Sequence, residues 1–403
     1  MQITERMEWG PLATWTPNRD YPVYNWFYYK EGFSRQLVMN ILDMFGAKER
    51  QLVMDPFCGA GTTMLTCRER GIDSVGFDSH PLAVFASRVK LMDYSTEDLI
   101  REIKRVTESE FVKPDLQIKN KLLKKGFPKK SLEDIVFYRN LIMQTRNKDI
   151  RDFLLLGLMN VAMKCSWLYK DGSVIKVRKG KKSKKGKGRK GSKSSKNIPL
   201  PRKVLKNEYK RMLKDIGKIM IHDSRVRADF GDARRLGMAD NVVDFIITSP
   251  PYVNKREYEK VFQVEQGLFM GTIGFEPYSS YIGSIDSNIK ELEKDSAGLL
   301  KVMESIGEDT GKIPKTAMAY FMDMYQAIEE MYRVCKPGAK VAVVVGNGCF
   351  PTRVIDSDII LTEIAEAVGF KPKKILVLNK RWCTRDRTKK IGIARESLLI
   401  WEK

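Results

Sequence analysis

The chain has 403 residues, of which 43% are hydrophobic, and this composition excludes a disordered protein. Its formal net charge of +22 favours a polyanionic partner, because cationic side chains that bind phosphates release counterions. No apolar run approaches the roughly 18 to 20 residues of a membrane span, so we expect a cytoplasmic protein without membrane contact. Six cysteines without a CxxC pair and only two histidines, His80 and His222, predict reduced thiols and no metal site.

The first part of the chain predicts an alternation of helices and strands. Apolar spacing indicates a helix, a strand, a helix, a strand and a helix, over residues 34–45, 51–55, 62–71, 74–78 and 81–92. Ser34 is the expected N-cap of the first helix. This order is typical of a parallel, doubly wound α/β sheet.

Residues 93–227 interrupt this pattern, because the strand signal fades and helical spacing dominates. Within them, residues 176–196 hold twelve Lys or Arg and no acidic residue. Their Gly, Ser and Lys composition cannot bury a core. We therefore expect a mobile loop that binds phosphates without reading a sequence.

The α/β pattern resumes after this helical insertion. Strands are predicted over residues 240–249, 341–347, 373–379 and 396–403, with a long helix over residues 319–334 that a Lys-Pro-Gly turn ends. Residues 254–315 are rich in Gly, Ser and Tyr, and we expect them to form loops.

The segment Asp55 to Thr63, DPFCGAGTT, lies at a strand end and opens a helix. Gly59 and Gly61 would let the backbone approach a ligand closely, and the N–H groups of a helix start attract a carboxylate or a phosphate. Asp78 ends the next strand, where a carboxylate can accept the hydroxyls of an adenosine ribose. Alone, the pattern is equally compatible with a nicotinamide cofactor or a purely structural turn.

The segment Thr248 to Tyr252, TSPPY, directly follows a buried strand. Ligands of open α/β sheets bind at the carboxyl ends of strands, so it is expected to share a crevice with the glycine turn. Pro250 and Pro251 give a rigid backbone whose carbonyls can accept hydrogen bonds from an amino group. Ser249 adds an acceptor, and Tyr252 a ring on which a base can stack. Alone, the segment is also compatible with a purely structural tight turn at the end of the strand.

Together the two segments resemble the amino-methyltransferases of DNA, which modify N4 of cytosine or N6 of adenine. The resemblance covers roughly residues 30–90 and 228–252 and implies a Rossmann-like, seven-stranded α/β sheet with S-adenosylmethionine as cofactor. It implies that Asp232 accepts a hydrogen bond from the amino group of the cofactor's adenine ring and that Asp78 binds the cofactor's ribose. The residues it assigns to the cofactor are Asp55, Phe57, Gly59, Gly61, Thr62, Asp78 and Asp232, and the catalytic tetrad is Ser249, Pro250, Pro251 and Tyr252.

The resemblance divides the chain into three parts. Residues 1–92 hold the N-terminal segment and the cofactor-binding half, and residues 228–403 hold the catalytic half of the methyltransferase domain. Residues 93–227 are the helical insertion. Target recognition is expected in this insertion, in the variable residues 254–315, or in both.

The tetrad allows direct methyl transfer to an exocyclic amine. If Ser249 and the Pro250 carbonyl accept hydrogen bonds from the N–H groups of this amine, the nitrogen lone pair is localised and can attack the sulfonium methyl in line. Methylation of cytosine carbon 5 would need a cysteine nucleophile, which in that enzyme family follows a proline, and no cysteine here does. The target base must leave the duplex, with Tyr252, Trp26 and Tyr28 as candidate stacking partners.

Serine at the first tetrad position is typical of the cytosine N4 enzymes, whereas adenine N6 enzymes more often have aspartate or asparagine. The sequence therefore favours site-specific N4 methylation of cytosine in duplex DNA, as in restriction-modification systems, at the nucleoid and with a restriction endonuclease as a candidate partner. Adenine N6 methylation, tRNA base methylation and a non-catalytic nucleic-acid-binding subunit are the alternatives. No motif indicates the oligomeric state.

Overall fold

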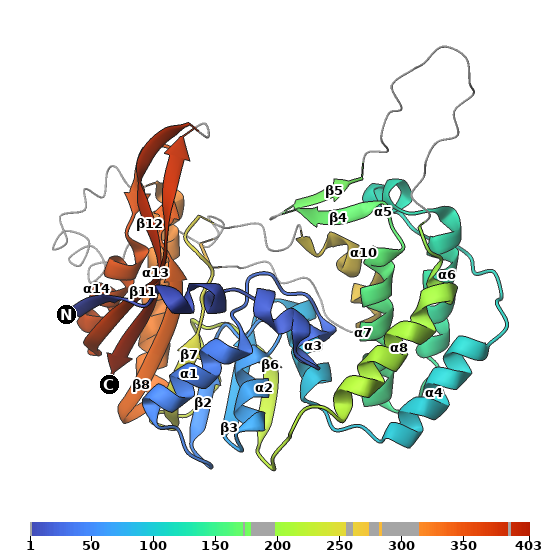
Figure 1. Cartoon of the computed structure of the whole chain (residues 1–403), viewed down its shortest axis with the longest axis horizontal. Coiled ribbons are helices and arrows are strands. Elements are labelled where there is room, and N and C mark those ends of the chain that lie inside the picture. The colour runs from blue at the N-terminus through green and yellow to red at the C-terminus, as the bar shows by residue number, and fades with distance from the viewer. Residues whose placement is uncertain are drawn as a thin grey trace. The chain divides into compact units, whose positions relative to one another are not determined.

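The computed structural model describes residues 2–171, 174–178, 198–254, 261–273, 282–283, 314–385 and 388–403. They form two compact units, both drawn in Figure 1. The sheet unit consists of Met1–Leu91, Ile219–Arg256 and Pro277–Lys403, and the helical unit of Met92–Lys218 and Glu257–Glu276. The chain therefore leaves the sheet unit twice to build the helical unit.

The sheet unit is built on one eight-stranded sheet with the order β1-β11-β12-β8-β7-β2-β3-β6. The strands are β1 Gln2–Glu5, β2 Leu52–Asp55, β3 Asp73–Asp78, β6 Val226–Phe230, β7 Val243–Thr248, β8 Cys335–Gly346, β11 Lys371–Arg385 and β12 Lys389–Glu402. Neighbouring strands from β6 to β8 are parallel, whereas β12 is antiparallel to both of its neighbours. The predicted Rossmann-like α/β architecture is confirmed, with β1 as an additional edge strand beyond the seven expected.

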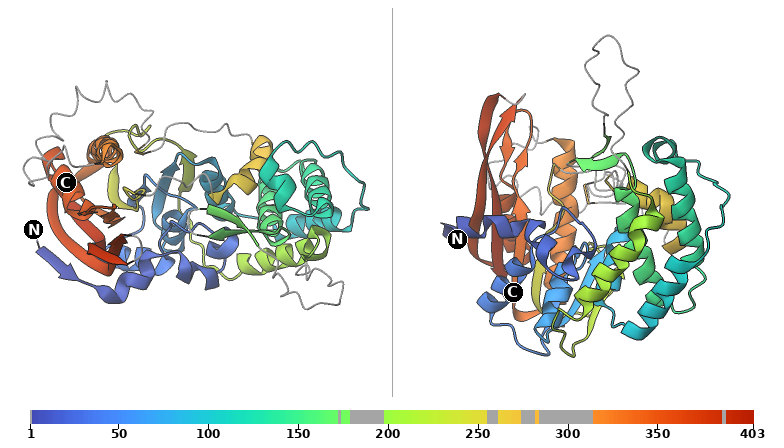
Figure 2. Two further views of the ribbon diagram at one scale, coloured as in Figure 1. Left: turned by 90° about the horizontal axis from the view of Figure 1, so that it is seen from above. Right: turned by 45° about the vertical axis from the view of Figure 1, so that its right-hand side comes forward.

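The central strands are buried on both faces, which explains their continuous apolar runs. In β7, Phe245 and Ile247 pack on the side of α1 and α2, while Ile246 packs on the side of α13 and α14. Figure 2 shows these helices on the two sides of the sheet. The helices of this unit are α1 Arg35–Phe45, α2 Thr62–Glu69, α3 Pro81–Leu91, α13 Lys315–Val334 and α14 Ser357–Val368.

The irregular N-terminal segment is fixed on the start of α1, and it contains the short 3-10 helices η1 Met7–Ala13, η2 Thr16–Asp20 and η3 Tyr24–Trp26. The buried Asn18 amide donates to the Phe33 carbonyl at 3.0 Å and accepts from the Arg35 N–H at 2.8 Å. Ser34 caps the helix as predicted, because its hydroxyl accepts from the Leu37 N–H. The segment is thus held close to the glycine turn that follows α1 and β2.

The helical unit is a group of packed helices with one β-hairpin. Its elements are α4 Thr96–Glu108, α5 Lys121–Gly126, α6 Lys129–Ile142, α7 Lys148–Lys164, β4 Leu168–Asp171, β5 Val174–Val177, α8 Pro201–Ile216 and α10 Gln263–Ile273. Gly157 in α7 allows the ring of Tyr209 in α8 to approach, since a Cβ there would lie 2.4 Å from Tyr209 Cε1. The Tyr209 hydroxyl donates to the Leu154 carbonyl at 2.9 Å and fixes this contact.

Three expectations are corrected here. Residues 254–315 were expected to form loops, but residues 263–273 form α10, whose Val264 and Leu268 are buried within the helical unit. Reduced thiols were expected, but Cys349 and Cys383 form a disulfide across 34 residues of sequence. The hairpin of β4 and β5 lies within residues 93–227, where helices were expected to dominate and no strand was predicted.

Three further expectations concern the lysine-rich run, membrane spans and metal sites. Residues 179–197, most of the lysine-rich run, lie outside the described residues. Within the part that the structure describes, no helix is long and apolar enough to cross a bilayer. In the same part, no three His, Cys, Asp or Glu side chains gather as metal ligands would.

Candidate active site

The ends of β2 and β7 meet at the carboxylate of Asp55, which is 2% exposed. The hydroxyl of Thr63, in the first turn of α2, donates to Asp55 Oδ2 at 2.6 Å, and the hydroxyl of Thr248 donates to Oδ1 at 2.6 Å. Burial raises the pKa of Asp55 to about 6, against the opposing effect of these bonds. The glycine turn and the Ser-Pro-Pro-Tyr segment therefore open from one point of the sheet.

Asp55 itself is enclosed rather than facing a ligand. Both of its oxygens accept hydrogen bonds from hydroxyl groups, and Oδ1 also accepts a hydrogen bond from the Phe57 N–H at 3.1 Å. The cofactor contact expected for Asp55 stays a prediction. The geometry suits a residue that joins the two loops.

Two glycines of the turn have backbone conformations that other residues rarely adopt. Gly59 has φ of 49° and Gly61, the N-cap of α2, has φ of 83°. A Cβ on Gly59 would lie 2.9 Å from Cε1 of Tyr29, and one on Gly61 would lie 2.9 Å from Oγ of Ser87. Tyr29 from the N-terminal segment and Ser87 from α3 thus pack directly against the turn.

Helix α3 also holds the carbonyl groups of the turn. Ser87 donates to the Gly59 carbonyl at 2.8 Å, and the buried Lys90 ammonium donates to the Ala60 carbonyl at 3.0 Å. Burial lowers the pKa of Lys90 to about 7. These contacts fix the direction of the peptide groups before any ligand binds, a role that the sequence analysis missed.

Asp78 lies at the end of β3, beside the glycine turn. Its Oδ2 accepts the Gly59 N–H at 2.8 Å and its Oδ1 accepts the His80 N–H at 2.7 Å. Burial raises the pKa of Asp78 to about 6, opposed by these two bonds. An ionised carboxylate has about four acceptor positions, so it can also accept two ribose hydroxyls.

Asp232 follows β6, next to the end of β3, but its carboxylate is engaged by Arg234. The Arg234 Nη2 donates to Asp232 Oδ2 at 2.6 Å and its backbone N–H donates to Oδ1 at 2.9 Å. Arg234 Nη1 also donates to the buried Asp323 of α13 at 2.8 Å. An adenine amino group would have to share Asp232 with this guanidinium, which the sequence did not suggest.

Tyr252, the last tetrad residue, is fixed at both ends of its side chain. Its hydroxyl donates to Glu396 Oε1 in β12 at 2.7 Å. Its ring covers Gly346 at the end of β8, where a Cβ would lie 2.6 Å from Tyr252 Cε2. Pro250 is buried, while Ser249, Pro251 and Tyr252 are half-buried, so the rest of the chain covers the segment only in part.

Of the two N-terminal aromatic residues expected to stack on a base, Trp26 is buried and Tyr28 is exposed. Trp26 is 1% exposed and belongs to the core, so it is not available to a base. Tyr28 is 43% exposed and makes an edge contact with Trp15, with ring centroids 4.8 Å apart. The adjacent Tyr29 is the N-terminal aromatic residue that packs against Gly59 of the glycine turn.

The remaining predicted residues, Phe57 and Thr62, flank the glycine turn. Phe57 is partly buried and packs against the core that the sheet shares with α13 and α14, and Thr62 is the first residue of α2. A doubly wound sheet with a glycine turn after β2, a carboxylate after β3 and Ser-Pro-Pro-Tyr after β7 is the arrangement that the sequence analysis expects of an amino-methyltransferase, with all three segments at the carboxyl ends of strands.

Comparisons with known proteins agree with this class. A profile of the family described as DNA methylase, with N6 and N4 methyltransferases, matches residues 8–86. The Type II methyltransferase M.BsoBI of Geobacillus stearothermophilus is 28% identical over 97% of this chain and 88% of its own length. The Type II methyltransferase M.AvaI of Nostoc sp. is 25% identical over 91% of this chain and 83% of its own length.

A solved S-adenosylmethionine-dependent methyltransferase from Methanosarcina mazei spans 90% of this chain and 96% of its own, at 10% identity and a TM-score of 0.32. That likeness is too distant to bear on the site. These similarities support a DNA amino-methyltransferase. Its cofactor is S-adenosylmethionine, as the sequence predicts.

The affinity for S-adenosylmethionine should depend on the ionisation of Asp78. Below its pKa of about 6 the carboxyl is protonated and loses acceptor positions, so affinity should be constant above pH 6 and fall by up to about tenfold per pH unit below it. Calorimetric titration at several pH values measures this dependence. The variant Asp78→Asn removes this carboxyl but retains Asp55, whose pKa is also about 6. If the affinity of this variant fell in the same way below pH 6, the pH dependence would belong to Asp55 and the assignment to Asp78 would be wrong.

Proposed function

We propose that this DNA amino-methyltransferase transfers the methyl group of S-adenosylmethionine to N4 of cytosine, at a specific site in duplex DNA, after the base has left the helix. The observation that supports this most is the Asp55 carboxylate, which joins Thr63 of the cofactor turn to Thr248, the residue before Ser249. Serine at position 249 favours cytosine over adenine within the family.

The cofactor would bind against the glycine turn. Gly59 and Gly61 lack the side chains that would crowd the turn, Asp78 retains acceptor positions for the ribose, and Phe57 and Thr62 flank the site. Bound there, the cofactor supplies an electrophilic methyl group on a sulfonium. Ser87 and Lys90 hold the turn in place from the other side.

The tetrad prepares the amine. Ser249 Oγ and the Pro250 carbonyl accept hydrogen bonds from the two N–H groups of the amine. These bonds localise the lone pair on nitrogen and direct it towards the methyl carbon. The N–C bond forms as the C–S bond breaks with its electron pair left on sulfur, and the methylated nitrogen then loses one proton to water. Tyr252, fixed by Glu396 and Gly346, stacks on the extruded base.

The remaining parts of the chain have proposed roles beside this site. The helical insertion, residues 93–227, recognises the target together with residues 254–315, of which α10 packs in the same helical unit. Full-length similarity to two Type II methyltransferases supports a site-specific modification enzyme that acts on the nucleoid beside a restriction endonuclease.

Transfer of tritiated methyl groups tests the proposed function. The purified chain, S-adenosylmethionine and duplex DNA should yield labelled DNA, and mass spectrometry of its nucleosides should show N4-methylcytosine. N6-methyladenine would overturn the choice of base, and label in tRNA alone would overturn the choice of nucleic acid. A folded sample that binds S-adenosylmethionine but labels neither would be a non-catalytic subunit.

A further inference from the structure

The carboxyl edge of the sheet bears a two-stranded extension, which we name the basic ribbon and define as residues 380–385 and 388–394. The pairing of β12 with β8 begins at Glu396, opposite Gly346 at the carboxyl end of β8. Because β12 is antiparallel to β8, the residues that precede Glu396 extend beyond the edge where β2 and β7 also end. Figure 1 shows β11 and β12 rising past the neighbouring strands.

The described residues of the ribbon have basic but no acidic side chains; the basic ones are Lys380, Arg381, Arg385, Lys389 and Lys390. Edge strands often have lysines that prevent pairing with other chains, and this alone would explain the charge. Such protection does not explain the two large apolar residues in the ribbon. Trp382 is 53% exposed and Ile393 is 47% exposed, and they face each other directly across the two strands.

These residues form one exposed patch. Paired residues of antiparallel strands share a face, so Trp382 and Ile393 lie together, and the Lys390 ammonium lies 4.3 Å from the Trp382 ring centroid. The opposite face is covered at Cys383, which is buried and bonded to Cys349. The patch thus combines an exposed aromatic ring, an aliphatic side chain and a cation.

The ribbon is tied to the catalytic segment. Cys383 is linked to Cys349, whose carbonyl accepts from the Asn254 amide at 3.4 Å, two residues after Tyr252. A ribbon of two strands fits the major groove of DNA, and lysines beside an exposed ring suit phosphates and base or sugar faces.

We propose that the basic ribbon binds duplex DNA beside the target base through Trp382, Lys390 and Ile393. This inference depends on the DNA substrate of the proposed function. It adds a contact on the sheet unit itself, separate from the helical insertion.

Fluorescence anisotropy with a labelled duplex tests the ribbon. Trp382→Ala changes no charge and should weaken duplex affinity roughly tenfold or more, as loss of a large apolar side chain that is buried on binding does. Lys390→Gln should reduce the slope of log affinity against log salt concentration by about 0.9, the value for one phosphate contact. Affinity for S-adenosylmethionine and the midpoint of thermal unfolding should match the unmodified chain in both variants.

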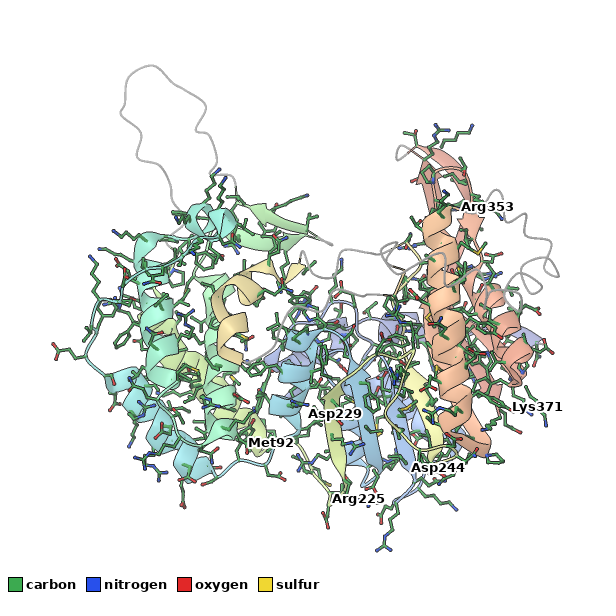
Figure 3. The ribbon with its side chains drawn as sticks, turned by 180° about the vertical axis from the view of Figure 1, so that it is seen from behind. Met92, Arg225, Asp229, Asp244, Arg353 and Lys371 are labelled. Carbon is green, nitrogen blue, oxygen red and sulfur yellow. A yellow bond between two sulfur atoms is a disulfide. The ribbon has the colours of Figure 1, made fainter. Side chains whose placement is uncertain are left out.

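Lys371→Gln is the matched control. Lys371 is exposed at the amino end of the same strand β11, and Figure 3 shows it near the sheet edge that also bears Asp244 at the start of β7. It should leave duplex affinity and the salt slope unchanged.

If Trp382→Ala and Lys390→Gln bind the duplex as Lys371→Gln does, the proposal is wrong. The binding assay does not require methyl transfer. A chain that binds duplex through the ribbon but transfers no methyl group would therefore refute the proposed function while supporting the ribbon.

Discussion

Replacing Ser249 by alanine should lower kcat by about 100- to 1,000-fold and leave the Kd for S-adenosylmethionine unchanged. The residue follows Thr248, whose bond to Asp55 fixes the start of the tetrad, and its hydroxyl is proposed to accept an N–H of the amine. Loss of one preorganised group that acts on the reacting atoms typically has an effect of this size on kcat. Single-turnover transfer of labelled methyl groups, with calorimetry of cofactor binding, measures both quantities.

Two variants serve as controls for this result. Ser249→Asn retains a side-chain oxygen as acceptor and should be more active than Ser249→Ala. Thr248→Val instead removes a bond to the buried Asp55 and should lower the free energy of unfolding by about 1 to 3 kcal/mol. If Ser249→Ala weakened cofactor binding as much as turnover, Ser249 would belong to the cofactor site and the acceptor role would be wrong.

The sequence predicts those parts of the fold and site that depend on local pattern and on the geometry of parallel sheets. Asp55, Gly59 and Asp78 stand at the ends of apolar stretches, and the carboxyl ends of parallel strands necessarily share an edge. The meeting of the glycine turn with Thr248 therefore follows from strand order alone. The structure adds the particular bonds from Thr63 and Thr248 to Asp55.

The residues that the sequence did not indicate have partners far along the chain. Glu396 is 144 positions from Tyr252, and Arg234 is 89 positions from Asp323, so no local spacing relates them. The strand β6, VRADF, alternates charged and apolar residues and lacks the continuous apolar run that marks β7. The apolar spacing of α10 is hidden because it lies within a stretch rich in Gly, Ser and Tyr.

The place of Tyr252 shows how such distant contacts act on the site. Gly346 ends β8 in the middle of the sheet, and its lack of a side chain lets the Tyr252 ring lie on the strand. Glu396, opposite Gly346 in the register of β12, accepts from the hydroxyl of the same ring. The paired strands β8 and β12 therefore fix both the position and the orientation of the Tyr252 ring.

Gly346→Ala should consequently lower kcat by about 100-fold. Its methyl carbon would lie 2.6 Å from Tyr252 Cε2, which real contacts do not allow, so the ring must move, and a displacement of about 1 Å near reacting groups has an effect of this order. Methyl transfer at saturating cofactor and DNA measures the loss. Gly237→Ala is the matched control, because a Cβ there meets no atom within 4 Å and turnover should be retained.

The effect of Gly346→Ala must act through Tyr252 if the assignment is right. In a Tyr252→Ala background the same substitution should therefore cause little further loss, since the ring that it displaces is gone. Glu396→Ala should lower kcat roughly tenfold, as loss of a hydrogen bond to a charged group does, whereas Glu396→Gln retains an acceptor and should preserve most of the activity. Full additivity of Gly346→Ala and Tyr252→Ala would show that the glycine supports the fold of β8 rather than the ring that faces the extruded base.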